Sequence, residues 1–448
     1  MNKVGLIWFR NDLRIHDNAA LSQANQECDL LIPLYCFDPR HYAKTHLFGF
    51  EKTGFFRAQF LIESIQDLNQ SLQSLDSALI LRNGNPENII PALVKEFGVS
   101  QIYCHKEITH EEINVENALL KALNNDSKKN CHVQFFEGHT LYQASELPFS
   151  IQQIPQVFTQ YRNAVEKHSK INAPIPFAGS NLKDLPQGLA SEKIPSFQDL
   201  NIEEKQVDVR NQMNFAGGET AGLKRLKEYI WDKDLLKTYK QTRNGLLGMD
   251  YSSKFSPWLA NGCLSPKMIY QEVQKYERER IKNDSTYWLI FELLWRDFFR
   301  FTAQKQGNQL FRSNGLQPQK KIKWKTDHDL FLSWSNGETG IPFIDANMKE
   351  LNATGFMSNR GRQNVASYLT KHLGLDWRMG AEYFESLLID YDVCSNYGNW
   401  AYIAGVGNDP IDRIFNPHKQ ADQYDSKGKY VEYWLGESIV EKQTSLFD

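Results

Sequence analysis

The chain has 448 residues, of which 41% are hydrophobic, and a formal net charge of −3. This length exceeds one comfortable core and predicts two domains, while the nearly balanced charge does not mark a nucleic-acid binder by overall electrostatics. The six cysteines have no metal-ligand spacing, so we expect reduced thiols in a cytoplasmic protein, without a metal site or an iron–sulfur cluster. We also expect neither a signal peptide nor a membrane span.

The N-terminal part alternates strand and helix patterns. Short apolar runs at residues 4–9, 30–37, 78–81, 101–105 and 133–136 suit buried parallel strands. Apolar residues at helical spacing lie between them, and Pro86 and Gly98 are typical of the start and the end of a helix. Residues 1–138 are therefore predicted to form a doubly wound α/β domain. No G-x-G-x-x-G follows the first run, which disfavours a standard dinucleotide site there.

The next segment changes in composition. From about residue 147 to 209 the chain is rich in Pro, Gln, Ser and Asn with weak periodicity, so residues 139–209 are predicted to be a connector that wraps the surface without a core of its own. Helical patterning then continues to about residue 405. We expect an all-helical domain over residues 210–425 and a short tail over residues 426–448.

Residues 351–402 place many polar side chains in an apolar helical region. They include N-R-G-R at 359–362, D-W-R at 376–378 and D-Y-D-V-C-S-N-Y-G-N-W at 390–400. Buried charges need partners or a ligand. A salt-bridged helical core is one interpretation, but the number of polar groups and the tryptophans among them favour a buried polar ligand.

In this order, N-R-x-R, D-W-R and D-x-D-x-x-x-N-x-G-x-W resemble the flavin-binding core of the photolyase/cryptochrome family. The upstream runs Y-K-Q-T-R-N-G-L-L-G-M-D-Y-S-S-K-F-S-P-W and N-D-S-T-Y-W-L-I-F-E-L-L-W-R resemble its cryptochrome DASH branch. The likeness extends from I-W-F-R-N-D-L-R at 7–14 to F-N-P at 415–417, nearly the whole chain. It implies a photolyase-type antenna domain followed by a helical FAD-binding domain.

The resemblance implies an FAD site. Its serines would cradle the phosphates, although on their own they are more typical of a helix N-cap. Arg362, paired with Asp390, would lie against the flavin ring and stabilise its negative charge. Asn396 matches the position that faces flavin N5, and Asn there favours photolyase-like redox behaviour. The full predicted set is Tyr239, Ser252, Ser253, Lys254, Phe255, Ser256, Arg296, Asn359, Arg362, Asp390, Asp392 and Asn396.

Three tryptophans match the electron-transfer triad of the family. They are Trp400, Trp377 and Trp324. Any one of them alone is more simply explained as core packing. The joint match beside the flavin pattern predicts a path for electrons from the protein surface to photoexcited FAD.

The resemblance also implies a substrate face. Glu292 resembles the carboxyl group that hydrogen-bonds a cyclobutane pyrimidine dimer, and Trp295 the aromatic side chain that stacks on it. Pairing of Glu292 with Arg296, four residues on, is the structural alternative. Asn359 and Gln363 stand where (6-4) photolyases carry histidines, which argues against (6-4) repair. Gln363 and Tyr402 are DASH features, which imply action mainly on single-stranded DNA.

Three further segments carry weaker predictions. Glu107 resembles the glutamate that holds a 5,10-methenyltetrahydrofolate antenna, although an exposed glutamate ordinarily has no such function. The basic run at residues 320–325 fits either solvated surface or a phosphate contact. The segment from Gln443 to Phe447 resembles the peptide that binds bacterial sliding clamps.

The function predicted from the sequence is light-driven repair of dimers by a monomeric, DNA-binding flavoprotein. A blue-light photoreceptor, or a DNA- or RNA-binding regulator with the same flavin chemistry, is the alternative. A flavoprotein without lesion activity is a third.

Overall fold

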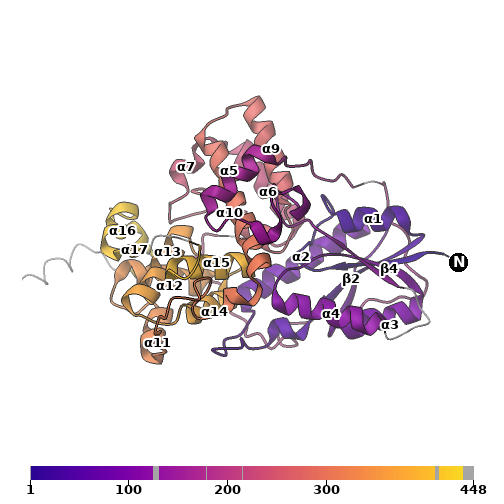
Figure 1. The fold of residues 1–448 in the computed structure, drawn as a ribbon, viewed down its shortest axis with the longest axis horizontal. Coiled ribbons are helices and arrows are strands. Elements are labelled where there is room, and N and C mark those ends of the chain that lie inside the picture. The colour runs from indigo at the N-terminus through magenta and orange to yellow at the C-terminus, as the bar shows by residue number, and fades with distance from the viewer. Residues whose placement is uncertain (1, 125–130, 178, 214, 409–412, 437–448) are drawn as a thin grey trace, which may run out of the picture.

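The computed structural model describes residues 2–124, 131–177, 179–213, 215–408 and 413–436. Figure 1 shows an α/β domain, drawn in indigo and magenta, packed against a helical domain drawn in salmon to yellow. Among the described residues, no helix is long and apolar enough to cross a membrane.

The α/β domain contains one parallel sheet with the strand order β3-β2-β1-β4-β5. Its first two strands have the predicted bounds, and the third lies two residues later than predicted. The strands are β1 (Val4–Phe9), β2 (Leu30–Phe37), β3 (Ile80–Asn83), β4 (Val99–His105) and β5 (His132–Phe136). The predicted doubly wound sheet is confirmed, with its topological switch between β1 and β4.

Alternate side chains of each strand enter two apolar layers, as the period of a strand requires. Ile7 and Phe9 face a cluster that includes residues of α1 and α2, whereas Leu6 and Trp8 face the residues of α3 and α4. These helices are α1 (Ala19–Glu27), α2 (Phe55–Gln73), α3 (Pro86–Phe97) and α4 (His110–Asn124). Gly98 caps α3 in the left-handed conformation, as predicted.

The C-terminal domain is helical, as predicted. Two π-helical turns, Glu228–Asp232 and Tyr368–His372, directly continue α6 and α13. The helices are α6 (Glu219–Lys227), α7 (Tyr239–Thr242), α8 (Ser256–Ala260), α9 (Pro266–Glu279), α10 (Asp284–Gln306), α11 (His328–Asn336), α12 (Pro342–Thr354), α13 (Asn359–Ser367), α14 (Trp377–Leu387), α15 (Val393–Ala404), α16 (Pro417–Tyr424) and α17 (Lys429–Leu435).

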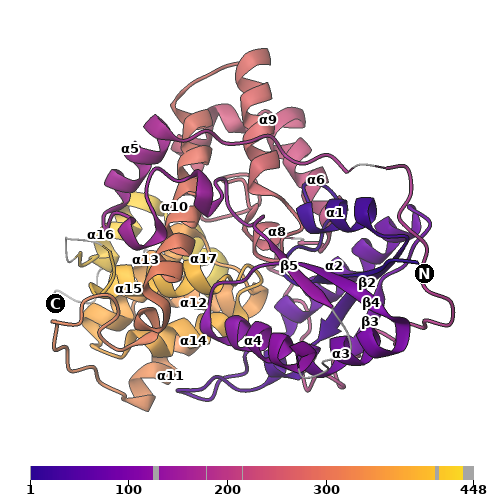
Figure 2. The same ribbon diagram turned by 45° about the vertical axis from the view of Figure 1, so that its right-hand side comes forward.

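The connector contributes to the core, which corrects the expectation that it only wraps the surface. Residues 158–168 form helix α5 (Phe158–His168), which lies beside α10 (Figure 2). Phe158, Tyr161 and Val165 are buried in the main apolar cluster. Their spacing of three and four residues is the pattern of one helix face, a signal that was hidden by the polar residues around it.

The predicted tail also begins with packed structure. Helix α17 lies within residues 426–448 and packs on α12, where Tyr430, Val431 and Trp434 are buried with Phe343. A helix of seven residues with three buried side chains is too short to identify from sequence. The clamp-like segment from Gln443 to Phe447 lies outside the described residues.

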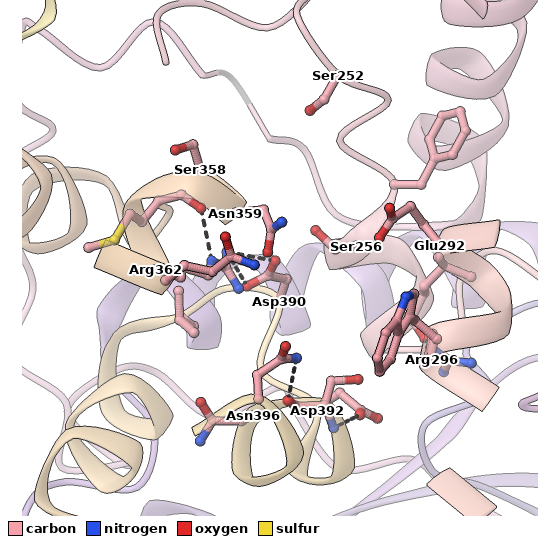
Figure 3. Close-up of a pocket in the computed structure, with 18 of the residues that line it drawn as sticks. Ser252, Ser256, Glu292, Arg296, Ser358, Asn359, Arg362, Asp390, Asp392 and Asn396 are labelled. Carbon is pink, nitrogen blue, oxygen red and sulfur yellow. Dashed lines mark hydrogen bonds and ion pairs between the residues drawn. The ribbon is translucent and has the colours of Figure 1, made fainter. Parts of the chain in front are cut away.

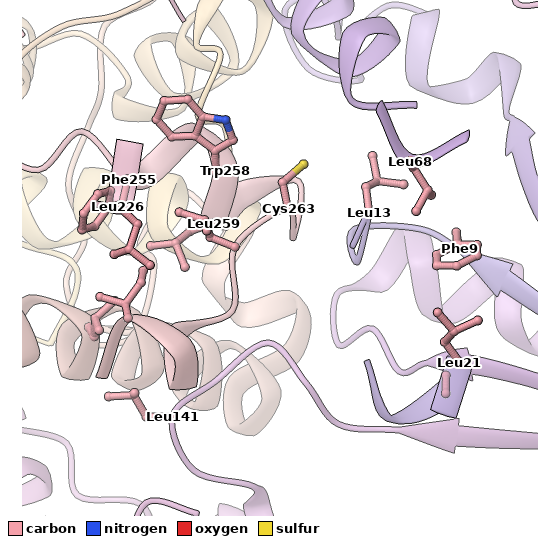
Figure 4. Close-up of a cluster of buried hydrophobic side chains, with 14 of the residues drawn as sticks. Phe9, Leu13, Leu21, Leu68, Leu141, Leu226, Phe255, Trp258, Leu259 and Cys263 are labelled. Atoms are coloured by element: carbon pink, nitrogen blue, oxygen red, sulfur yellow. The ribbon is translucent and has the colours of Figure 1, made fainter. Parts of the chain in front are cut away.

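The two domains share one apolar cluster (Figure 4). Leu13 and Phe9 of the α/β domain belong to the same cluster as Trp258 and Leu259 of the helical domain. At Gly262 the backbones come so close that an added Cβ would lie 1.8 Å from the carbonyl oxygen of Asn11. The seam is therefore a packed interior, and it fixes the position of α8 and α10 relative to the sheet.

We expect Phe158→Ala to destabilise the protein by about 3–5 kcal/mol, because it removes a buried ring from α5 and leaves a cavity. Thr159→Ala, on the exposed side of the same helix, should change stability by less than about 0.5 kcal/mol. Urea unfolding of both variants checks this. Equal stability of the two variants would mean that α5 does not belong to the core.

Candidate functional site

A cavity of about 450 Å³ lies between α8, α10, α13 and α15 (Figure 3). This volume is typical of ligand pockets, which span about 300–1,000 Å³. Every residue predicted to bind FAD lines it, as do the predicted catalytic residues Glu292, Trp295 and Gln363 and the inner tryptophan, Trp400. The tertiary structure thus brings together side chains as far apart in the sequence as Tyr239 and Trp400.

Arg362 and Asp390 form an ion pair at one side of the cavity. The Arg362 Nη2 lies 3.0 and 2.9 Å from the two carboxylate oxygens, and its Nε donates to the carbonyl of Met357 at 2.9 Å. Asp390 is almost fully buried, while a quarter of the Arg362 side chain is exposed. The guanidinium is held rigidly by two partners and can present its remaining edge to an anionic ring.

The loop of residues 252–256, which we call the serine loop, also lines the cavity, and Figure 3 shows Ser256 near Asp390 with Ser252 farther away. Buried Arg225 fixes the loop by donating to the carbonyls of Met249, Ser252 and Ser253 at 3.0–3.2 Å. The N-cap of α8 is Phe255, without a side-chain capping bond. The serine hydroxyls are therefore not used as helix caps, and Arg225 is a support that the sequence analysis missed.

Lys254 is the most unusual group of the cavity lining. It is 3% exposed, has a φ of +59° and has no hydrogen-bond partner for its Nζ in the described parts of the chain. The ammonium lies 3.4 Å from the ring centre of Tyr251 and 4.5 Å from that of Phe356. Burial lowers the pKa of Lys254 well below its ordinary value, although Glu350 partly opposes this. Such a buried, strained cation fits a site for an anionic group.

Asn396 and Asp392 lie on and before α15. The Asn396 amide donates to the carbonyl of Ala381 at 2.9 Å, which leaves its Oδ1 without a partner in the described chain. Asp392 accepts from the backbone N–H of Ser395 at 2.7 Å and caps the helix. Arg296 donates to the carbonyls of His139 and Leu259, so it links α10 to the connector and to α8.

Glu292 is not paired with Arg296. Its Oε1 lies 2.8 Å from Arg243 Nη2 and accepts from the Trp288 indole at 3.1 Å. Oε2 makes no hydrogen bond within the residues that the structure describes, and Glu292 lines the cavity. Burial raises the pKa of Glu292, which Arg243 only partly offsets. Arg243, one turn after Tyr239 in Y-K-Q-T-R, is a second residue that the sequence analysis missed.

Aromatic rings form one wall of the cavity. Trp295 stacks on Phe158 with ring centres 3.7 Å apart and meets Tyr402 edge-on at 5.9 Å. Gln363 accepts a bond from Arg360 at 2.8 Å, which orients its amide. One face of Trp295 is therefore covered by Phe158 of the connector helix, so a ligand can stack only on the other face of the Trp295 ring.

The three predicted tryptophans differ in exposure. Trp400 is 2% exposed and lines the cavity, Trp377 is fully buried, and Trp324 is half-buried. The Trp400 ring packs so closely on Gly380 that a Cβ there would lie 2.1 Å from it, and Gly380 is three residues after Trp377 on α14. The indole N–H groups of Trp377 and Trp324 both donate to the carbonyl of Ser313, at 3.0 and 2.9 Å. The three rings thus run from the cavity towards the surface.

Glu107 is buried, which corrects the expectation of an exposed glutamate. It follows β4 at the topological switch and is 3% exposed. Its two oxygens lie 2.9 Å from Asn11 Nδ2 and 2.6 Å from Arg300 Nη2 of α10. Burial alone would raise the pKa of Glu107, but Arg300 and Arg10 lower it overall. The switch point, where doubly wound sheets usually bind ligands, is occupied here by the helical domain.

The cavity fits FAD by its chemistry. Its lining includes the buried Lys254 amine, three serine hydroxyls, the oriented Arg362 guanidinium and the Asn396 amide oxygen. Phosphates and an anionic ring are groups that such a set would hold.

We expect Lys254→Met to stabilise the FAD-free protein by about 1–3 kcal/mol, because it removes a buried amine that has no hydrogen-bond partner in the described chain. FAD affinity should fall about ten- to a hundredfold, since a charge-assisted contact is lost. In the parent chain, the unfolded state holds the Lys254 proton up to about pH 10.5 while the folded state releases it at lower pH. The parent's stability should therefore rise with pH in this window, a slope that the variant lacks.

Thermal unfolding over a pH series and titration with FAD measure both effects. Exposed Lys205 provides the control, since Lys205→Met should alter neither. A less stable FAD-free Lys254→Met protein, or one with unchanged FAD affinity, would contradict the assignment.

Comparison with known proteins identifies the family of the chain. The family described as FAD binding domain of DNA photolyase matches residues 288–444, and the family described as DNA photolyase matches residues 5–180. Cryptochrome DASH of Gloeobacter violaceus is 55% identical over 97% of this chain and 86% of its own length. Cryptochrome DASH of Xenopus laevis is 52% identical over 97% and 83%.

Solved structures show the same relationship. The cryptochrome of Synechocystis sp. PCC6803 superposes with a TM-score of 0.92 at 52% identity, over 97% of this chain and 89% of that one. A bacterial class III photolyase from Agrobacterium tumefaciens gives 0.84 at 28% identity, over 97% and 87%. The chain therefore belongs to the cryptochrome DASH branch of the DNA photolyase/cryptochrome family.

Proposed function

We propose that the protein splits cyclobutane pyrimidine dimers with light, mainly in single-stranded DNA. When bound, reduced FAD supplies an electron on illumination and recovers it after the ring has split, so no net redox change occurs. The observation that carries the proposal is the free Oε2 of Glu292, which lies in the same cavity as the flavin-type set and beside an aromatic wall.

Glu292 and Arg243 suit a dimer that gains negative charge. The pKa of Glu292 is raised, so a larger fraction of this carboxyl group is protonated and can donate a hydrogen bond to a pyrimidine carbonyl. Arg243 Nη2 lies 2.8 Å from the same carboxyl group and adds positive charge nearby. Together they would stabilise charge as it develops on the substrate.

Trp295 and Tyr402 would hold the pyrimidines by stacking and edge contacts, and stacking contributes about 1–3 kcal/mol per base. Photolyases act on bases outside the helix, and extrusion from a duplex costs a few kcal/mol. The preference for single strands is proposed on the resemblance, because nothing in the cavity identifies a group that would offset this cost. Asn359 and Gln363, in place of histidines, support dimers over (6-4) products.

A folate antenna stays a proposal that rests on the resemblance alone. Both oxygens of Glu107 are held by Asn11 and Arg300. Each carboxylate oxygen can accept a second hydrogen bond, so Glu107 could keep both partners while it contacts 5,10-methenyltetrahydrofolate.

Trp400, Trp377 and Trp324 are proposed to carry electrons from the surface to the cavity. The decrease in exposure from Trp324 to Trp377 supports this order. So does the shared carbonyl of Ser313, which places the two outer indoles side by side.

The function is tested by illuminating the reduced, FAD-loaded protein with oligonucleotides that contain a dimer, in single-stranded and in duplex form. We expect restored thymines mainly in the single strand. Comparable duplex repair would overturn the strand preference. No repair in either form would favour the photoreceptor alternative.

Glu292→Gln is the matched variant in the same assay. The amide still donates a hydrogen bond but cannot titrate, so repair should slow about tenfold. The parent's rate should fall as pH rises through the raised pKa of Glu292, because the donating acid is lost. The variant's rate should be independent of pH over that range, and a parallel decline in both would exclude Glu292 as the titrating group.

Trp400→Phe should abolish rapid photoreduction of FAD, because phenylalanine is much harder to oxidise than tryptophan. Trp334→Phe is the control, since Trp334 is fully buried and its ring centre lies 6.2 Å from that of Trp400, but it is not part of the proposed path. Flavin absorbance under blue light measures both. Unchanged photoreduction in Trp400→Phe would eliminate this path.

A further inference from the structure

A second cavity, of about 440 Å³, lies beside Trp324 in the segment that joins α10 to α11. Figure 2 shows this orange segment next to α15. Four cations and, among the described residues, no carboxylate line the cavity; the cations are Arg312, Lys320, Lys321 and Arg378. We call this cavity the basic hollow.

Most of this positive charge is not neutralised. Arg378 is paired with Asp376 at 2.6 Å, and Lys320 donates to the carbonyl of Gly405. Arg312 and Lys321 are exposed and make no ion pair in the described ranges of the chain. The net charge of the whole chain is −3, so an anion that approaches this side meets a local field opposite in sign to that of the molecule.

The wall of the basic hollow touches the outer tryptophans. Ser313 lines it, and its carbonyl oxygen accepts the indole N–H of both Trp324 and Trp377. The carbonyl dipole favours positive charge on either ring, but it is too weak a base to take the proton. The proposed electron path therefore ends at the edge of a cluster of four cations, two of which make no ion pair in the described chain.

We propose that the basic hollow is the docking site of a small, multiply anionic one-electron donor that re-reduces Trp324. This inference rests on the proposed electron path. In the step, one electron passes from the donor to the oxidised Trp324 ring; the donor is oxidised by one electron and the indole becomes neutral. No bond forms or breaks, because the ring keeps its N–H on the Ser313 carbonyl.

The lining favours a small anion over nucleic acid. Single strands are held by aromatic rings on which the bases stack, and no aromatic side chain lines the basic hollow. Ile322 is its exposed apolar residue, 39% exposed. Four of the eight lining residues are cations, which is the composition of a site for a compact anion.

The test is flash photolysis of the full, FAD-loaded chain with ferrocyanide as the anionic donor and hydroquinone as a neutral one. We expect the double variant Arg312→Glu/Lys321→Glu to lower the second-order rate constant for recovery of the tryptophan signal with ferrocyanide about tenfold or more. The rate with hydroquinone should not change. Added salt should slow the parent with ferrocyanide and have little effect on the variant.

The control pair is Lys323→Glu/Lys325→Glu, which reverses the same charge in the same basic run but outside the lining. This control pair should lower the rate constant with ferrocyanide by less than a third of the factor found for Arg312→Glu/Lys321→Glu. If both double variants lowered the rate constant with ferrocyanide equally, general surface charge would explain the result and the proposed site would be wrong. The proposed site would also be wrong if an undamaged single-stranded oligonucleotide prevented ferrocyanide from reacting with the parent chain, because the basic hollow would then bind nucleic acid.

A second readout does not need FAD. Iodide and acrylamide quench the fluorescence of exposed tryptophans, and the difference between the parent and Trp324→Phe isolates Trp324. Iodide quenching of Trp324 should fall at least about threefold in Arg312→Glu/Lys321→Glu, with acrylamide quenching unchanged. Unchanged iodide quenching would mean that the basic hollow does not attract anions to Trp324, even if the electron path is correct. If no tryptophan signal forms after the flash, the path fails and the quenching result alone decides the hollow.

Discussion

The structure depends on how charged groups are buried between the two domains. Arg14 is 1% exposed, and its guanidinium donates to the carbonyls of His16, Asp17, Gly138 and Gly262 at 2.8–3.1 Å. Glu107 meets Arg300 from the opposite domain. A buried charge without a partner costs several kcal/mol. Separation of the two domains would therefore be unfavourable, because it would remove the partners of Arg14, Glu107 and Arg300. The seam thereby fixes α8 and α10, and both line the cavity.

Some polar side chains of the cavity are bonded to other parts of the protein, whereas others keep a donor or an acceptor for a ligand. Arg362, Arg225 and Asp392 have their partners in the protein and hold the loops and helices in place. The Lys254 ammonium has no such partner among the described residues, and one oxygen each of Glu292 and Asn396 is likewise unused there. A buried polar group without a partner lowers stability, so its presence in a lined cavity indicates a ligand. Both kinds of side chain belong to the same cavity, and the side chains bonded within the protein hold the loops and helices that carry the unpaired groups.

Arg300 connects the seam to the cavity. Its guanidinium pairs with Glu107 on one side and lies 3.8 Å from Asp392 on the other. Asp392 in turn caps α15, the helix that carries Asn396 and Trp400. Glu107 and the start of α15 are therefore joined by consecutive charged side chains at the seam between the domains.

The sequence by itself determined the elements whose burial is periodic and the groups whose order is distinctive. The bounds of β1 and β2, the ends of α3 and the residues predicted to line the flavin site required only local pattern or motif order. Tertiary structure decided which partner each polar group has. Glu292 pairs with Arg243 and not with Arg296, Glu107 is buried by Arg300, Phe158 covers Trp295, and one carbonyl serves two indoles. Periodicity records which face of an element is buried, but it holds no information about which distant segment will cover that face, because that is settled only when the two domains pack.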